Sequence, residues 1–435
     1  MLIEFSASNF KSIKSEIHLS LVAGSSRKVR AHHSKATGNS KAPYVLRAGA
    51  IFGGNGSGKS TTIAALSFIR DFAIGSATDR ASGSEIDVAP YKFSKECLDQ
   101  PSEFEIVFLV DDDIYQLGFI VDSKRVFSEW LFLTPKGQPT RQLIDRNYDS
   151  ETDSYEIKIS KTLPGPRTTW KTSTRSDALV FSTAVQLNAS PLLPAYNWLK
   201  ESLRIVPTNH RINPAFTAEM VQGEQEENIM RFLRDVGIDV LAIDSYEQDV
   251  IGPDDLSHLP SELRSYMEKE LKGQKRRRIV CYHEGDDGER VGLPYEEESD
   301  GTQALISFAG PWIDVLENGL TIVVDELDSS LHSFALRYLL ESYFTSAAGE
   351  GKGGQLLFTT HDSLTMDAEV LHRDQIWLVE RNPRRGTTLR PLSDYEVRSN
   401  ESYHAGYLRG RYGGVPVTGP RTVRIEPVST KNGSH

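Results

Sequence analysis

Residues 53–60 of the chain read Gly-Gly-Asn-Gly-Ser-Gly-Lys-Ser, which matches the phosphate-binding pattern G-x-x-x-x-G-K-[ST]. A short apolar run at residues 48–52 precedes this loop. Apolar residues at helical spacing follow it, at Ile63, Leu66 and Ile69. Because the motif functions between a strand and a helix, this context predicts a P-loop.

The chemistry of the loop follows from its residue types. Glycines let several backbone N–H groups turn toward phosphate oxygens, and the following helix adds its positive N-terminal end. Lys59 is expected to reach the β- and γ-phosphates of ATP as a catalytic residue, and the Ser60 hydroxyl is expected to hold Mg²⁺. The expected nucleotide-binding residues of the loop are Gly53, Gly54, Asn55, Gly56, Ser57, Gly58, Lys59, Ser60 and Thr61.

The composition of the 435 residues is that of a soluble, cytoplasmic protein of two or three domains. No apolar stretch approaches the roughly 20 residues that span a bilayer, and the N-terminus lacks the features of a signal peptide. The two cysteines, Cys97 and Cys281, are far apart in the sequence, which favours a reducing compartment, and neither has metal-ligand spacing.

The net charge of −11 argues against a protein wrapped uniformly in nucleic acid but leaves room for a local basic patch. Two groups of basic residues raise that possibility, although a solvated charged face is the favoured interpretation of both. They are Lys272, Lys275, Arg276, Arg277 and Arg278, and Arg381, Arg384 and Arg385.

The chain is expected to form an α/β fold with an inserted lobe. Strands are predicted at residues 3–10 and 16–22, with a polar, mobile loop at 24–43. Three further strands at 103–110, 114–121 and 126–133 predict an antiparallel meander. Alternating helices and strands at residues 302–358 predict a parallel sheet.

The expected domain organisation has four parts. Residues 1–134 form the first part of an ATPase domain, and residues 135–278 form an insert lobe that is mainly helical after 177. Residues 279–416 form the second part of the ATPase domain, and 417–435 a flexible tail. Helices are predicted within the lobe at 188–203, 224–236 and 261–271, and the absence of sustained heptads excludes a coiled-coil arm.

A second motif completes the nucleotide site. Residues 321–326 read Thr-Ile-Val-Val-Asp-Glu, an apolar strand that ends in two acids, as in the Walker B strand of P-loop enzymes. Asp325 is expected to hold the metal and Glu326 to activate the attacking water as general base.

The order of the remaining motifs resembles that of ABC-type ATPases, including the SMC-like branch. Residues 298–303 read Glu-Ser-Asp-Gly-Thr-Gln, residues 327–332 read Leu-Asp-Ser-Ser-Leu-His, and residues 359–362 read Thr-Thr-His-Asp. The resemblance implies that Ser299 and Gly301 belong to a signature motif that binds the γ-phosphate held by a second subunit. It also implies that Asp328 belongs to the D-loop and that His361 is the catalytic switch histidine.

The sequence departs from that family in two places. The signature reads Glu-Ser-Asp-Gly-Thr where the family has Leu-Ser-Gly-Gly-Gln, so only the positions of Ser299 and Gly301 match. Gln100 and Gln116 are the candidates for the Q-loop glutamine, and neither has diagnostic neighbours. This resemblance covers about residues 1–134 and 279–380.

A closer resemblance spans nearly the whole chain. Asn-Phe-Lys-Ser-Ile at residues 9–13, Pro-Ser-Glu-Phe-Glu-Ile at 101–106 and Tyr-Leu-Arg-Gly-Arg-Tyr-Gly-Gly-Val-Pro at 407–416 accompany the motifs above. In this order they are similar to the stand-alone AAA/ABC-like ATPases of bacterial defence islands, the RloA-like group. That resemblance implies an ATPase that responds to phage and controls a separately encoded effector, often a nuclease.

The motifs leave two function classes open. The first is a switch that dimerises around ATP, or forms a higher homo-oligomer, and binds a protein partner. The second is an SMC-like clamp that engages DNA directly in repair or maintenance, which the basic group around Lys275 keeps open. An intrinsic nuclease is not supported, because the acids at Asp367, Glu369, Asp374, Glu380, Asp394 and Glu396 show no metal-ligand grouping.

Overall fold

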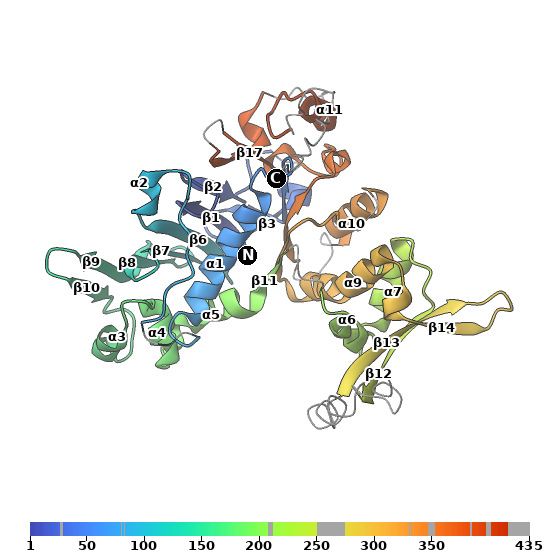
Figure 1. The fold of residues 1–435 in the computed structure, drawn as a ribbon, viewed down its shortest axis with the longest axis horizontal. Helices are drawn as coiled ribbons and strands as arrows, with labels where there is room; N and C mark the ends of the chain where they lie inside the picture. The colour runs from blue at the N-terminus through green and yellow to red at the C-terminus, as the bar shows by residue number, and fades with distance from the viewer. Residues whose placement is uncertain are drawn as a thin grey trace, which may run out of the picture.

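The computed structural model describes residues 1–26, 29–79, 81, 83–207, 212–249, 275–329, 331, 333–346, 353–382, 385–396 and 402–415. These residues form two lobes joined by a central sheet (Figure 1). One lobe carries an antiparallel sheet and helix α1, and the other carries helices α6, α7 and α9 with a small sheet at its outer end (Figure 1). The predicted helix at 261–271 and the predicted tail at 417–435 lie outside the described residues.

The central sheet has the parallel core that the sequence predicts. Its strand order is β11 (Leu203–Val206), β15 (Thr321–Val324), β16 (Gln355–Thr360), β5 (Ala48–Phe52), β17 (Ile376–Arg381) and β18 (Thr387–Pro391). All neighbouring pairs are parallel except β17 and β18. Every residue of β5, β15 and β16 is buried, as is usual for parallel strands covered on both faces.

The second sheet is wholly antiparallel and extends the predicted meander. Its strand order is β10 (Ser154–Ile159), β9 (Arg141–Asp149), β8 (Val126–Thr134), β7 (Asp113–Val121), β6 (Ser102–Val110), β1 (Leu2–Ser8) and β2 (Ile17–Ser20). Helix α1 (Lys59–Gly75) packs on it, with the Phe68 ring 4.7 Å from that of Phe104 and the Phe72 ring 5.2 Å from that of Phe119.

Three expectations need correction. The boundary at residue 134 is wrong, because β9 and β10 continue the meander sheet beyond it. The lobe of 135–278 is less separate than expected, since β11 pairs with β15 in the central sheet. The segment at 24–43 is more ordered than a loop, because β3 (Ser34–Ala36) pairs with β4 (Tyr44–Leu46). Each of these two strands has three residues, which is too short for a period-two pattern to be recognised in the sequence.

Helices lie in both lobes (Figure 1). The predicted helix at 224–236 is confirmed as α7 (Glu226–Asp235), and the one at 188–203 as a series of short helical segments from Ser190 to Ser202. The others are α2 (Lys95–Leu98), α3 (Arg167–Ser173), α4 (Val180–Gln186), α6 (Pro214–Val221), α9 (Asp300–Asn318), α10 (Ser333–Ser346) and α11 (Tyr403–Leu408). Among the described residues, no helix is both long and apolar enough to cross a membrane.

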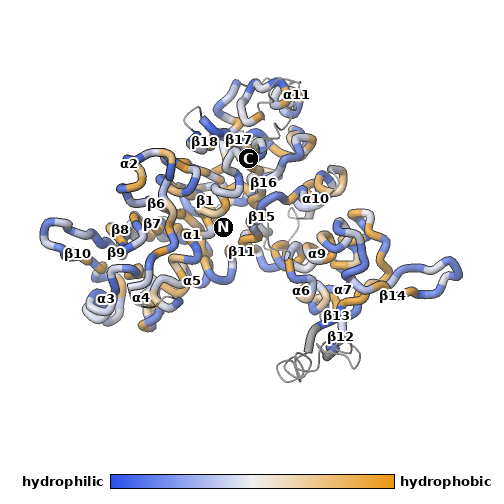
Figure 2. Tube along the Cα trace, viewed as in Figure 1, coloured by the Kyte–Doolittle hydropathy of each residue, from blue (hydrophilic) through white to orange (hydrophobic). Residues whose placement is uncertain are grey.

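The described part of the first basic group, residues 275–278, lies at the start of a strand. Strand β13 (Lys275–Glu284) pairs with β12 (Ala242–Asp249) and with β14 (Arg290–Pro294) in the small outer sheet. Hydrophilic residues mark the tip of the β13–β14 hairpin, while apolar segments follow the strands of the two large sheets (Figure 2).

Two buried side chains of opposite charge face each other between β8 and β9. Glu129 of β8 lies in register with Arg146 of β9, and both side chains are buried. Burial raises the pKa of the Glu129 carboxyl, while the Arg146 charge and the N–H groups of Phe181 and Val180 oppose that shift. The Arg146 guanidinium donates 2.6 Å to the Ala178 carbonyl, so the pair also holds the approach to α4.

We expect Arg146→Met to lower the free energy of unfolding by about 3–5 kcal/mol, because it leaves the Glu129 carboxylate buried without its counter-charge. Denaturant unfolding measures the loss. The control is Lys158→Ala, which breaks an exposed pair with Glu156 in the same sheet and should change stability by less than about 1 kcal/mol. Equal effects of the two substitutions would contradict this assignment.

Candidate nucleotide-binding site

The P-loop turns sharply between β5 and α1. Gly58 has a φ of 117°, in the left-handed region, and a Cβ at this position would collide with the Thr387 side chain. Only glycine therefore fits both the conformation and the space. The N–H groups of the first turn of α1, which have no acceptor within the helix, come from Lys59, Ser60 and Thr61. This places a preformed anion site at the carboxyl end of β5.

Lys59 is held under the loop. Its side chain is 4% exposed, and its Nζ donates to the Gly53 carbonyl at 2.8 Å and lies 3.2 Å from His361 Nδ1. Burial lowers the pKa of Lys59, and the carboxylates of Glu326 and Asp325 partly offset this shift. The ammonium is therefore poorly compensated within the protein, which favours an incoming anion.

The Walker B acids follow β15 as the sequence predicts. Asp325 is buried, and Thr359 of the adjacent strand β16 donates to its Oδ1 at 2.5 Å. The same Thr359 oxygen accepts the Glu326 N–H at 2.7 Å. Glu326 has a φ of 56°, a strained conformation for a residue with a side chain, and its Oε1 lies 3.6 Å from His361 Nε2. Lys59, Asp325, Glu326 and His361 thus form one cluster.

The D-loop residue Asp328 is connected to this cluster. Its Oδ2 accepts the His361 N–H at 3.0 Å, so the segment after β15 fixes the backbone that carries the histidine. The structure therefore brings together five residues that the sequence placed in separate motifs.

Sequence reasoning missed two threonines of the site. Thr359 lies on β16, two residues before His361, which directly follows the strand. The period of a strand was the signal that would have placed both side chains on one face. Thr387 of β18 donates to the Ser57 carbonyl at 3.3 Å and bonds the Ser12 hydroxyl at 2.8 Å. Its N–H also donates to the Ser12 carbonyl at 2.8 Å, so a segment near the N-terminus supports the P-loop.

The donor set fits a nucleotide with Mg²⁺. Hard oxygen ligands suit this ion, and the Asp325 carboxylate with the Ser60 hydroxyl offers them beside the P-loop. The contact from Thr359 orients the carboxylate of Asp325, as outer partners of metal ligands do. Asp325 and Ser60 are therefore the residues that would hold Mg²⁺.

The signature residues lie apart from this cluster. Ser299 caps α9, its hydroxyl accepting the Thr302 N–H at 3.2 Å, and Gly301 lies in the first turn. A hydrogen bond of 2.6 Å from His283 to Glu298 secures the segment just before the cap. Within the described part of the chain, no hydrogen bond or ion pair joins Ser299 or Gly301 to residues 53–61.

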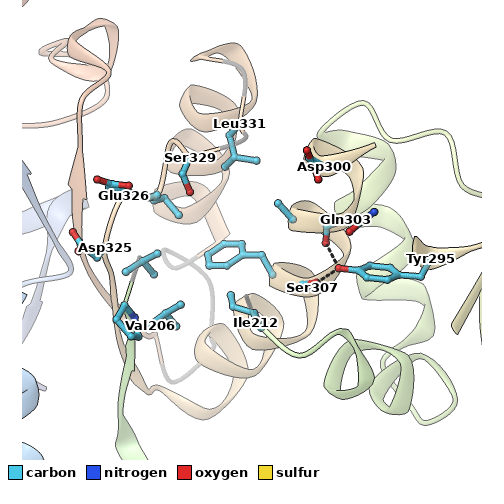
Figure 3. A pocket seen from close by; sticks show the side chains of 15 residues that line it. Val206, Ile212, Tyr295, Asp300, Gln303, Ser307, Asp325, Glu326, Ser329 and Leu331 are labelled. Atoms are coloured by element: carbon cyan, nitrogen blue, oxygen red, sulfur yellow. Dashed lines mark hydrogen bonds between the residues drawn. The ribbon is translucent and has the colours of Figure 1, made fainter. Parts of the chain in front are cut away.

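A cavity of about 240 Å³ separates α9 from the Walker B segment. Asp325 and Glu326 lie on one wall, and Asp300 and Gln303 on the other (Figure 3). The Tyr295 hydroxyl donates to the Gln303 carbonyl at 3.0 Å and fixes the far wall. The N-terminal part of α9 therefore lies across this cavity from the Walker B acids of its own chain.

The structure leaves the Q-loop unassigned. The Gln116 side chain donates to Glu105 at 2.9 Å within the meander sheet. Gln100 contributes its backbone carbonyl to the Asn9 side chain, at 2.8 Å. The Gln116 side chain therefore has a structural role, whereas the contact of Gln100 is made by its backbone.

The central parallel sheet, the P-loop and the two acids after β15 define an α/β P-loop NTPase of the ABC-ATPase type. The family model described as "AAA domain, putative AbiEii toxin, Type IV TA system" matches residues 50–367, and the chain belongs to this family of AAA-type ATPases.

Two solved structures show similarity over most of the chain. The SMC head domain from Thermotoga maritima has 14% sequence identity and a TM-score of 0.38, covering 91% of this chain and 99% of that one. The Smc head domain with an extended coiled coil bound to the C-terminal domain of ScpA, from Pyrococcus furiosus, has 11% identity and a TM-score of 0.37, covering 90% and 97%. A comparison with curated proteins finds no match.

We expect Thr359→Val to lower ATP hydrolysis by about 10–100-fold, because valine keeps the shape but orients neither Asp325 nor Glu326. Steady-state phosphate release, titrated with Mg²⁺, measures the effect. The control is Thr360→Val, at the next residue of β16. It removes a hydroxyl that accepts the Asp362 N–H and makes no described contact with Asp325 or Glu326. A Thr359 variant as active as the Thr360 variant would rule out this role.

Proposed function

We propose that this protein is an ATP-binding and ATP-hydrolysing switch that dimerises around ATP and controls a separately encoded effector, a nuclease, in bacterial defence against phage. The main support for the proposal is that the signature residues lie apart from the other residues of the nucleotide site. Lys59, Asp325, Glu326 and His361 lie together, whereas the N-terminus of α9 lies across a cavity. A second copy would supply Ser299 and Gly301 to complete the site.

Each residue of the cluster has a role in this proposal. Lys59 neutralises phosphate charge. Asp325 and Ser60 would hold Mg²⁺, which would neutralise further charge on the phosphate oxygens. The Glu326 carboxylate orients and deprotonates the attacking water. His361 lies within reach of both Lys59 and Glu326 and so links the phosphate end to the base.

Exposed apolar residues near the site support a dimer interface there, which we call the seam. Phe334, at the start of α10 just after the D-loop, is 77% exposed, and Leu364, three residues after His361, is 56% exposed. Large apolar side chains with such exposure beside a nucleotide site are typical of a surface that a protein covers. Because the γ-phosphate distinguishes ATP from ADP, a seam closed over it would give the difference in affinity that a switch needs.

The charges of the outer sheet favour the switch over the DNA clamp. Arg278 pairs with Glu296 at 3.2 Å, and Arg277 lies 3.7 Å from Glu219. Basic residues engaged by acids of the same chain offer less charge to a phosphate backbone. The matching family's description names a toxin of a toxin–antitoxin system, and this supports a function shared with a separately encoded partner.

We expect Glu326→Gln to sediment as a dimer with ATP and Mg²⁺ and as a monomer with ADP. The glutamine amide cannot act as general base, so ATP stays unhydrolysed, while the dimer interface is unchanged. Analytical ultracentrifugation gives the two masses. Adding Lys59→Ala to the same variant should abolish the ATP-dependent dimer. A mass that ATP leaves unchanged would overturn the proposed dimerisation.

A further inference from the structure

The C-terminal motif Arg-Gly-Arg-Tyr-Gly-Gly-Val at residues 409–415 has no part in the site described so far. It follows α11 and returns the chain to the end of β17. There the Gly414 carbonyl accepts the N–H of Gly54, the second residue of the P-loop, at 3.0 Å. Gly54 and Gly414 are 360 residues apart in the sequence (414 − 54).

This hydrogen bond fixes one particular peptide group. The Gly53–Gly54 peptide presents its carbonyl to Lys59 Nζ at 2.8 Å and its N–H to Gly414. Both edges of the peptide plane are therefore engaged, one by the lysine and one by the C-terminal segment. Rotation of this peptide would move the carbonyl that positions the lysine.

Two side chains hold Gly414 in place. The Tyr407 hydroxyl donates to the Gly414 carbonyl at 2.9 Å, and the Gly414 N–H donates to Glu380 Oε2 at 3.2 Å. Tyr407 is buried, and burial raises the pKa of its hydroxyl, which keeps it a donor. Gly413 has a φ of 72°, and a Cβ there would collide with the Glu380 carboxylate. The close approach of this segment therefore requires glycine.

We propose that residues 403–415 act as a brace, a segment that holds the P-loop in its nucleotide-binding conformation. Tyr407 and Glu380 are positioning residues that set the affinity for nucleotide through Gly414. The inference rests on the nucleotide site of the proposed function and adds a regulatory element to it. By linkage, whatever loosens this segment weakens nucleotide binding, and nucleotide binding tightens the segment to the same degree.

The brace is tested by nucleotide affinity without hydrolysis. Calorimetric titration of ADP is expected to show about 3–10-fold weaker binding for Tyr407→Phe and for Glu380→Ala. Glu380→Gln keeps an oxygen that accepts the Gly414 N–H and should restore most of the affinity. The matched control is Tyr412→Phe, which removes a buried hydroxyl of the same segment that packs against Gly406.

Hydrogen exchange of the full-length protein provides a second measurement. ADP should slow exchange in residues 403–415 of the wild type, and less so in Glu380→Ala. If the wild type binds ADP, and Tyr407→Phe and Glu380→Ala bind it with the same affinity, the proposed brace is wrong but the proposed function stands. A wild type that binds no nucleotide would instead overturn the proposed function.

Discussion

The parallel pairing of β16 with β5 on one side and β15 on the other is the constraint on which the site depends. The register sets Thr360 opposite Phe52, and Phe358 opposite both Ala50 and Val324. Parallel strands end at the same edge of a sheet, so the P-loop, the Walker B acids and His361 emerge side by side. A shift of one residue in β16 would turn Thr359 away from Asp325 and Glu326.

Segments near both ends of the described chain support this edge. Ser12 reaches the P-loop through Thr387, and Gly414 contacts it directly at Gly54. The P-loop is therefore stabilised at its first half by the C-terminal segment and at its second half by β18. Such long-range contacts couple the conformation of the site to the integrity of the whole fold.

The sequence was sufficient for features with a strong local pattern. The P-loop, the apolar strand before Asp325 and the three strands of the meander have clear periodicity or a fixed motif, and the structure confirms them. The sequence was insufficient where tertiary contacts determine the place of a strand or the role of a residue. Strand β11 is short, and only its pairing with β15 makes it part of the central sheet. The roles of Thr359, Thr387 and Gly414 depend on partners distant in sequence, which one sequence without structure does not reveal.

The central claim is that each ATP site combines the cluster of one copy with the signature helix of another. Mixing two inactive variants, Lys59→Ala and Gly301→Asp, tests it most directly. In a mixed dimer one site carries both defects and the other carries none, so an equal mixture should recover ATP hydrolysis, up to about half of the wild-type rate when every dimer is mixed. Each variant alone should remain inactive. No recovery in a mixture shown to contain mixed dimers would contradict the account.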